Sequence, residues 1–120
     1  MQTHLRSINA ITLAISSMSK AYRFYEALGF EPNYGGENAD FSSFKVGENF
    51  LNLDLGTERG DRPFWGRVIF YVDDVYAMYR QVLELGLEPE TEPRDAEWHE
   101  RYFHLLDPDG NELSFAKPIE

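Results

Sequence analysis

The sequence predicts an α+β protein made of two tandem βαβββ modules, which form curled mixed sheets around a cleft. Three observations support this. Residues 11–32 recur as residues 68–89, each copy begins with strand-like alternation, and each continues with a helix-like apolar stripe. Because the apolar positions keep the same phase, both copies should pack in the same way. The residues that recur unchanged are Tyr22, Arg23, Leu28, Gly29, Glu31 and Pro32, at Tyr79, Arg80, Leu85, Gly86, Glu88 and Pro89.

The length of the chain suits one compact domain. It has 120 residues, of which 42% are hydrophobic, and this is close to the common domain size. Two half-size modules would then share one core. We place module one at residues 8–56, a linker at residues 57–65 and module two at residues 66–117, because Gly56 to Gly66 has a loop-like composition.

Each module is predicted to begin with a strand and a helix. Ser17 and Asp74 are the expected helix N-caps, and Gly29 and Gly86 the expected ends, because glycine adopts left-handed backbone at the least cost. A Glu-Pro pair should break each chain segment after its helix. The predicted first strands carry Ile11, Leu13 and Ile15, and Val68, Phe70 and Val72. The predicted buried helix stripes are Met18, Tyr22, Tyr25 and Leu28, and Val75, Tyr79, Val82 and Leu85.

Further strands are expected around residues 41–46, 50–55, 101–106 and 112–116, with a turn at residues 107–110. Strand residues alternate between faces, so the large apolar ones should face the helices. These are Leu51, Leu53, Leu55, Phe103, Leu105, Leu113 and Phe115. The opposite face carries Ala10, Thr12, Ala14, Asn52, Asp54, Arg67, Tyr71, Tyr102, His104, Glu112 and Ser114. This mixed face would line a ligand cleft; the alternative is a second solvated sheet face.

The charge of the chain limits the classes of partner that it can bind. The formal net charge is −10, with −2 in residues 1–60 and −8 in residues 61–120, so no nucleic-acid partner is expected. Residues 88–100 carry six acids against Arg94, which indicates a solvated loop or a rim that attracts cations. No apolar run is long enough for a membrane span and no secretory segment is seen, so we expect a cytoplasmic protein without a membrane partner. The absence of Cys excludes thiol chemistry.

Three motifs resemble the vicinal oxygen chelate superfamily, which includes glyoxalase I, extradiol dioxygenases and the fosfomycin and bleomycin resistance proteins. They are FYEALGF, VDDVYAMYRQVLELG and RYFHLLDPDGNELSFA. The resemblance covers residues 8–117 and implies a cleft that, in the metal-dependent members, holds a divalent ion. The usual ligand positions fall on Ala10, Asn52, Arg67 and Ser114. These form no competent ligand set, so we expect no metal and no other cofactor.

Arg67 would place a fixed cation where the related proteins hold a metal ion. Its guanidinium could bind the carboxylate or phosphate of a ligand. Alternatively, it pairs within the chain with Asp54 or Glu112, since a buried cation needs compensation. The two roles are not exclusive.

His104 is the leading acid/base candidate, since a similar location in the fosfomycin enzymes carries a substrate-contacting side chain. Imidazole titrates near neutrality, and Tyr102, Asp54 or Glu112 could orient it. Alternatively, His104 is a hydrogen-bonded cleft residue without catalytic duty, or it forms a displaced metal site with Asp54 and Glu112.

Trp98 could close over a planar ligand. Alternatively, its ring serves only in packing.

These observations favour a metal-independent binder of a small aromatic or cationic compound. Its ligand-binding residues would be Asn52, Asp54, Arg67, Tyr71, Trp98, Glu112 and Ser114. The alternative is a glyoxalase-like lyase or isomerase, or a dioxygenase, using His104 with Arg67 or with a displaced metal. Its catalytic residues would be His104 and Tyr102. By the resemblance, we also expect a homodimer, in which the cleft forms within one chain or across two.

Overall fold

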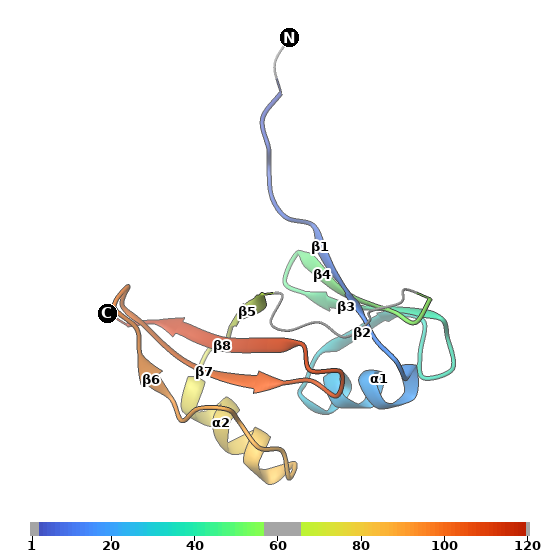
Figure 1. The fold of residues 1–120 in the computed structure, drawn as a ribbon. Coiled ribbons are helices and arrows are strands. Elements are labelled where there is room, and N and C mark those ends of the chain that lie inside the picture. Colours follow the sequence, from blue (N-terminus) through green and yellow to red (C-terminus); the bar gives the residue numbers. More distant parts are fainter. Residues whose placement is uncertain (1–2, 57–65, 120) are drawn as a thin grey trace. The chain divides into compact units, whose positions relative to one another are not determined.

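The computed structural model describes residues 3–56 and 66–119 and divides the chain into two compact units, Met1–Arg59 and Gly60–Glu120 (Figure 1). Each unit has the order strand, helix and three strands, so the predicted α+β fold of two tandem βαβββ modules is confirmed. The predicted linker at residues 57–65 lies outside the described residues. None of the helices that the structure describes is long and apolar enough to span a bilayer.

The first unit holds one helix and a four-stranded mixed sheet with the strand order β1-β4-β3-β2. Strand β1 runs parallel to β4, and the other neighbours are antiparallel. Its elements are β1 (Ala10–Ala14), α1 (Met18–Ala27), β2 (Glu31–Tyr34), β3 (Phe41–Val46) and β4 (Asn49–Asp54).

The second unit repeats this topology with the strand order β5-β8-β7-β6. Strand β5 runs parallel to β8, which pairs antiparallel with β7. Its elements are β5 (Arg67–Tyr71), α2 (Val75–Glu84), β6 (Arg94–Asp95), β7 (Glu100–Leu106) and β8 (Glu112–Pro118). Since β6 has only two residues, the segment between α2 and β7 is largely irregular.

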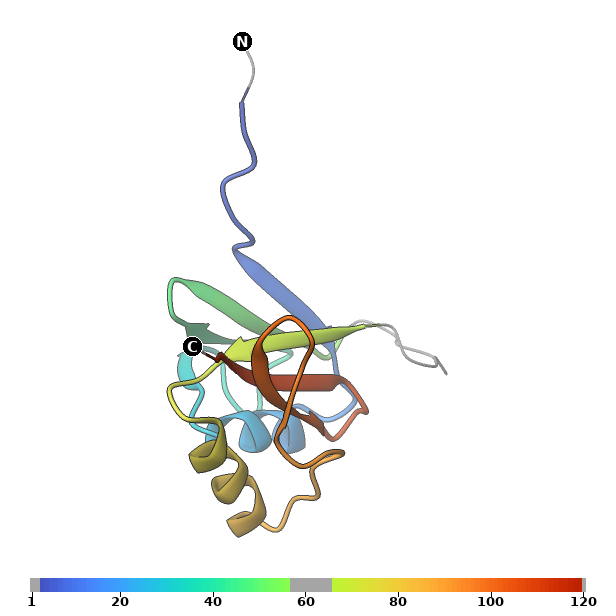
Figure 2. The same cartoon turned by 90° about the vertical axis from the view of Figure 1, so that its left-hand side faces the viewer.

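Each helix lies along one face of the sheet in its own unit (Figure 1 and Figure 2). In the first unit Tyr25 and Phe44 are fully buried, and in the second Val82, Phe103 and Phe115 are at most 1% exposed. The predicted helix-facing strand residues are buried, with one exception. Leu55 is 37% exposed, because β4 ends one residue earlier.

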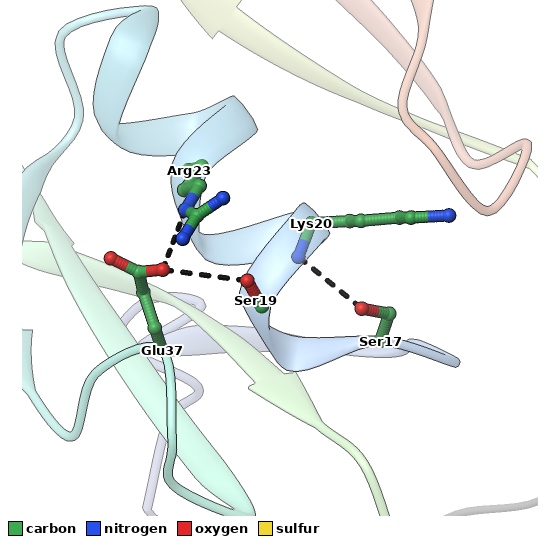
Figure 3. Close-up of polar contacts among 5 residues, drawn as sticks. All are labelled: Ser17, Ser19, Lys20, Arg23 and Glu37. Carbon is green, nitrogen blue, oxygen red and sulfur yellow. Dashed lines mark hydrogen bonds and ion pairs between the residues drawn. The ribbon is translucent and has the colours of Figure 1, made fainter.

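Both helices begin and end as predicted. The Ser17 hydroxyl accepts a hydrogen bond from the Lys20 amide at 3.3 Å (Figure 3), and Asp74 caps α2 in the same way at 3.0 Å. Gly29 and Gly86 follow the last helical turns with φ of 101° and 79°, the left-handed conformation that favours glycine.

Glu37 fastens the loop between β2 and β3 to the side of α1. Its carboxylate accepts hydrogen bonds from Arg23 at 2.5 Å and from the Ser19 hydroxyl at 3.4 Å (Figure 3). The Arg23 side chain is 69% exposed, and an exposed ion pair of this kind stabilises a fold by at most about 1 kcal/mol.

Two sequence predictions need correction. The predicted buried stripe of α2 is shorter than expected: Val75 and Val82 are buried, but Tyr79 is half-buried and the C-cap Leu85 is 43% exposed. The C-cap of α1, Leu28, is buried. The first Glu-Pro pair does not break the chain, since Glu31 and Pro32 form the start of β2. Because β2 is an edge strand, a proline without an amide hydrogen is tolerated there.

Candidate functional site

The candidate site lies on the face of the second sheet that does not contact α2. The strand registers set Arg67 opposite Glu112 and His104 opposite Ser114. Alternation along β5, β7 and β8 therefore places these four side chains on one face, as the sequence predicts. The buried residues between them, such as Phe103 and Phe115, face the helix side.

A pocket of about 290 Å³ opens on this face. The volume lies near the lower end of the range for small-molecule sites. Ile69 and Ala116 supply apolar lining. The polar and aromatic lining residues are Arg67, Trp98, Glu100, Tyr102, His104 and Ser114.

Glu112 is the central charge of the site. One carboxylate oxygen, Oε2, lies 3.0 Å from Nη2 of Arg67, and the other, Oε1, lies 3.1 Å from Nδ1 of His104. The Glu112 side chain is only 12% exposed, so water screens these contacts weakly. The predicted pairing of Arg67 with Glu112 is confirmed. The other predicted partner, Asp54, belongs to the first unit, where its carboxylate accepts a hydrogen bond from the Gly56 amide.

The surroundings of His104 favour its neutral imidazole over the protonated form. Burial lowers its pKa; the Glu112 carboxylate opposes this shift, whereas the charges of Arg67 and Arg94 add to it. The Tyr102 ring lies beside the imidazole, with 5.0 Å between ring centroids. A neutral imidazole next to a carboxylate can accept a proton or bind a metal ion, or it can serve only as a hydrogen-bonding residue of the pocket. The three predicted roles of His104 therefore stay open.

Glu90 joins the site, although the sequence interpretation did not single it out. The Glu90 amide donates to the His104 carbonyl at 2.8 Å, and the His104 amide donates to the Thr91 hydroxyl at 3.2 Å. These bonds fasten the segment before β6 to β7. Glu90 as a whole residue is exposed, but partial desolvation of its carboxyl raises its pKa. The neighbouring Glu112 carboxylate raises this pKa further, and the charge of Arg67 opposes the shift.

Glu100 organises a second group, of aromatic residues. Its carboxylate accepts hydrogen bonds from Nε1 of Trp98 at 3.0 Å and from the Tyr71 hydroxyl. The hydrogen bond to Glu100 raises the pKa of Tyr71, with smaller contributions from burial and from the Glu100 charge. Trp98 and Tyr71 are 67% and 65% exposed, so the carboxylate fixes two rings that are open to a ligand.

The acidic segment is thus only partly a solvated loop. Glu88, Glu92 and Glu97 are exposed, as that interpretation predicts, but Glu100 is half-buried at the start of β7. The sequence offered one signal for Glu100. It stands four residues before His104, and alternation would place both side chains on the same face if the strand were extended to it. No periodic pattern marks Glu90.

The four positions where the related proteins hold a metal do not fit a divalent ion. Ala10 has no donor atom, and the Asn52 amide donates to the Thr12 hydroxyl at 3.2 Å within the first unit. In the second unit, Arg67 is a fixed cation and Ser114 a neutral hydroxyl, which is a poor ligand. A different set offers suitable donors: one ligand atom each from Glu90, His104 and Glu112 lie within 4.8 Å of one another.

The fold and the pocket together define a small α+β protein of two βαβββ units with a ligand-sized pocket on one sheet. The chain belongs to the Glyoxalase/Bleomycin resistance protein/Dioxygenase superfamily, whose sequence model matches residues 7–115. No curated protein sequence matches the chain.

Solved structures share the fold at low sequence identity. A glyoxalase/bleomycin resistance protein/dioxygenase from Nocardioides aligns with a TM-score of 0.75 and 18% identity, over 99% of this chain and 87% of that chain. A superfamily member from Sphaerobacter thermophilus aligns with a TM-score of 0.75 and 24% identity, over 93% and 97%. A virulence protein from Salmonella typhimurium aligns with a TM-score of 0.76 and 21% identity, over 98% and 100%.

Proposed function

We propose that the chain binds a small aromatic compound carrying positive charge in the pocket of its second unit, without a metal ion at the usual ligand positions of the superfamily. The observation that carries this proposal is the group formed by Glu100, Trp98 and Tyr71. One carboxylate fixes the edges of two exposed rings, which leaves ring faces for a ligand and a negative charge between them.

The chemistry of this group favours a cation. A positively charged ligand is attracted to the electron-rich faces of Trp and Tyr, and each such contact contributes about 0.5 to 2 kcal/mol. The Glu100 carboxylate adds a charge of the opposite sign to the ligand. Ile69, Ala116 and Tyr102 supply further apolar surface for a planar molecule.

The positive charge of Arg67 repels a cationic ligand less strongly than the sequence predicts. Its guanidinium lies 3.0 Å from the Glu112 carboxylate, which compensates most of its field in the pocket. The predicted preference of Arg67 for an anionic ligand is therefore weakened. The acidic balance of residues 61–120 acts in the same direction.

Calorimetric titration with matched pairs of compounds tests the proposal. Each pair contains an N-methylated aromatic cation and its uncharged isostere, and a chelator is present throughout. We expect the cation to bind at least about tenfold more tightly, which corresponds to about 1.4 kcal/mol. Glu100→Gln should remove most of this preference, whereas Glu97→Gln, an exposed acid of the same segment, should keep it. Equal affinity for both members of every pair would contradict the proposal.

A second candidate function is proton abstraction by a glyoxalase-like lyase or isomerase. The observation that favours it is the His104 imidazole at 3.1 Å from the Glu112 carboxylate, in surroundings that lower its pKa. Such a pair can remove a proton next to a carbonyl group, and Arg67 would then stabilise the resulting oxyanion.

Solvent deuterium exchange into a panel of 2-oxo aldehydes and 2-oxo acids, followed by proton NMR, tests this second function. His104→Gln should abolish exchange, and His99→Asn should leave it unchanged. Absence of exchange with the whole panel would favour the binder over the enzyme. Dioxygenase chemistry needs a redox-active metal and therefore depends on the ion site considered next.

A further inference from the structure

We propose that Glu90, His104 and Glu112 form a binding site for one divalent transition-metal ion. One donor atom from each residue lies within 4.8 Å of the other two. The site goes beyond the proposed function, because the group of Glu100, Trp98 and Tyr71 needs no ion to hold an aromatic cation. It also differs from the usual metal position of the superfamily, since it shares none of that position's four residues.

The backbone arranges the three residues before any ion arrives. His104 in β7 and Glu112 in β8 are diagonal neighbours on one face of the antiparallel pair, since His104 pairs with Ser114 and Leu106 pairs with Glu112. Glu90 is held beside them by the hydrogen bond from its amide to the His104 carbonyl at 2.8 Å. Because the fold already places these residues close together, little conformational entropy is lost when they bind an ion.

The distances suit a first coordination shell. Nitrogen and oxygen ligands lie about 2.0 to 2.2 Å from zinc, so two donors on one ion stand roughly 3 to 4 Å apart. The 3.1 Å between Nδ1 of His104 and Oε1 of Glu112 already falls in this range. The widest separation allowed by the cluster is 4.8 Å, so a side-chain rotation that moves one donor by about 1 Å closes the site.

The donor chemistry favours an ion that accepts imidazole as well as carboxylate ligands, such as Zn²⁺ or Mn²⁺, over Ca²⁺. One imidazole and two carboxylates are ligands that these ions accept, and three protein ligands leave positions open for water or substrate. One carboxylate oxygen of Glu90 and one of Glu112 lie within 4.8 Å of each other, so the two charges repel. A divalent ion bound between them would compensate both charges.

Arg67 limits the affinity of the site. It occupies Oε2 of Glu112 and leaves Oε1 directed toward His104, so it orients the ligating oxygen while its charge repels an ion. Arg94 also adds positive charge near His104. We therefore expect a weaker site than a zinc centre with uncompensated ligands, and an affinity that rises when the charge of Arg67 is removed.

The test is calorimetric titration of the full chain, without an affinity tag and stripped by chelator, with Zn²⁺ alone and with Mn²⁺ alone. We expect one saturable site per chain in the wild type. Glu90→Gln should weaken binding at least tenfold, whereas Glu92→Gln, an exposed acid in the same segment, should change it less than twofold. His99→Asn controls for an adventitious imidazole, and asparagine suits the left-handed backbone there, with φ of 64°.

Arg67→Gln supplies a readout that loss of fold cannot imitate, because it should raise the affinity for the ion severalfold. Circular dichroism checks that each variant is folded. Binding that is absent in the wild type, or unchanged in Glu90→Gln, or weakened equally by Glu92→Gln, would overturn the site. The aromatic-cation titration in the presence of chelator stands apart from this test, so failure of either proposal leaves the other measurable.

Discussion

Glu112 shows how one carboxylate determines the properties of several neighbours. It compensates the charge of Arg67, contacts the imidazole of His104 and lies close to the Glu90 carboxylate. The Glu112 side chain is only 12% exposed, whereas that of Arg67 is 39% exposed. Loss of the Glu112 charge therefore removes a favourable contact, but water still reaches the guanidinium and reduces the cost.

We predict that Glu112→Gln lowers the free energy of unfolding by about 1 kcal/mol, since solvent screens the exposed Arg67 partner. The amide keeps the shape of the side chain but cannot compensate Arg67. Urea denaturation at neutral pH measures the change, and Glu92→Gln is the matched control with an expected change within about 0.5 kcal/mol. Equal stability of the two variants would show that Glu112 makes no net contribution to the fold.

Tyr71 provides a pH-dependent readout of the aromatic group. Its hydroxyl donates to Glu100, which raises the pKa of Tyr71 above that of a free tyrosine. The neutral form is thus favoured in the folded state. This stabilisation is fully present below the unfolded pKa of about 10 and is lost as the pH rises through the higher folded pKa.

We predict that phenolate absorbance assigned to Tyr71, from the difference between wild type and Tyr71→Phe, titrates at higher pH than a model tyrosine. Glu100→Gln should return this titration toward the ordinary value, because the charged acceptor is lost. An unchanged Tyr71 titration in Glu100→Gln would contradict the hydrogen bond on which the proposed ligand site depends.

The loop that leads into β3 depends on a glycine with no space for a side chain. Gly35 has φ of 80°, and a Cβ atom there would lie 2.5 Å from the Phe41 carbonyl and 2.6 Å from the Ser42 hydroxyl. That hydroxyl binds both the amide and the carbonyl of Gly36. A substitution would therefore combine backbone strain with displacement of a buried hydrogen-bonding group.

We predict that Gly35→Ala lowers the free energy of unfolding by more than about 2 kcal/mol, since left-handed strain alone costs 1 to 2 kcal/mol. Gly36→Ala should change stability little, because a Cβ atom there meets nothing within 4 Å and its φ is not positive. Thermal unfolding followed by circular dichroism compares the two. Similar losses in both variants would argue against this account.

For the entire chain, the two units have the same topology but differ in the candidate site residues that they carry. Within the described residues, the pocket and the Glu90, His104 and Glu112 cluster both belong to the second unit. The first unit keeps the fold but carries Ala10 and Asn52 where the related proteins bind metal. Edge strands β1 and β5 remain in the described sheets, and edges of this kind can be covered by a second copy.

We predict that the chain forms a homodimer. A two-fold pair covers the same surface on both copies, so association should stop at two chains. Sedimentation equilibrium should then give twice the 13.9 kDa mass of the chain. A mass of 13.9 kDa at micromolar concentration would contradict this prediction. Ligand titrations before and after dilution would then show whether the pocket depends on the partner.

Local patterns were enough to predict much of this protein. The alternation along β5 and β8, the caps at Ser17 and Asp74 and the left-handed Gly29 and Gly86 all depend on residues close in sequence, and the repeat shows the same local pattern twice. Such signals reflect backbone sterics and periodic burial, which act over a few residues. For the same reason, Arg67 and Glu112 could be assigned to one face before their contact was known.

The contacts of Glu90 and Glu100 emerged only when the chain was folded. Both lie in an acidic segment without periodicity, and composition alone makes that segment look solvated. Glu90 reaches His104 and Glu112 because its backbone is hydrogen-bonded to β7, and Glu100 meets Tyr71 from a strand far along the chain. Pairings over such separations depend on sheet register and burial, which local sequence does not encode, so the chemistry of the site followed from the packing.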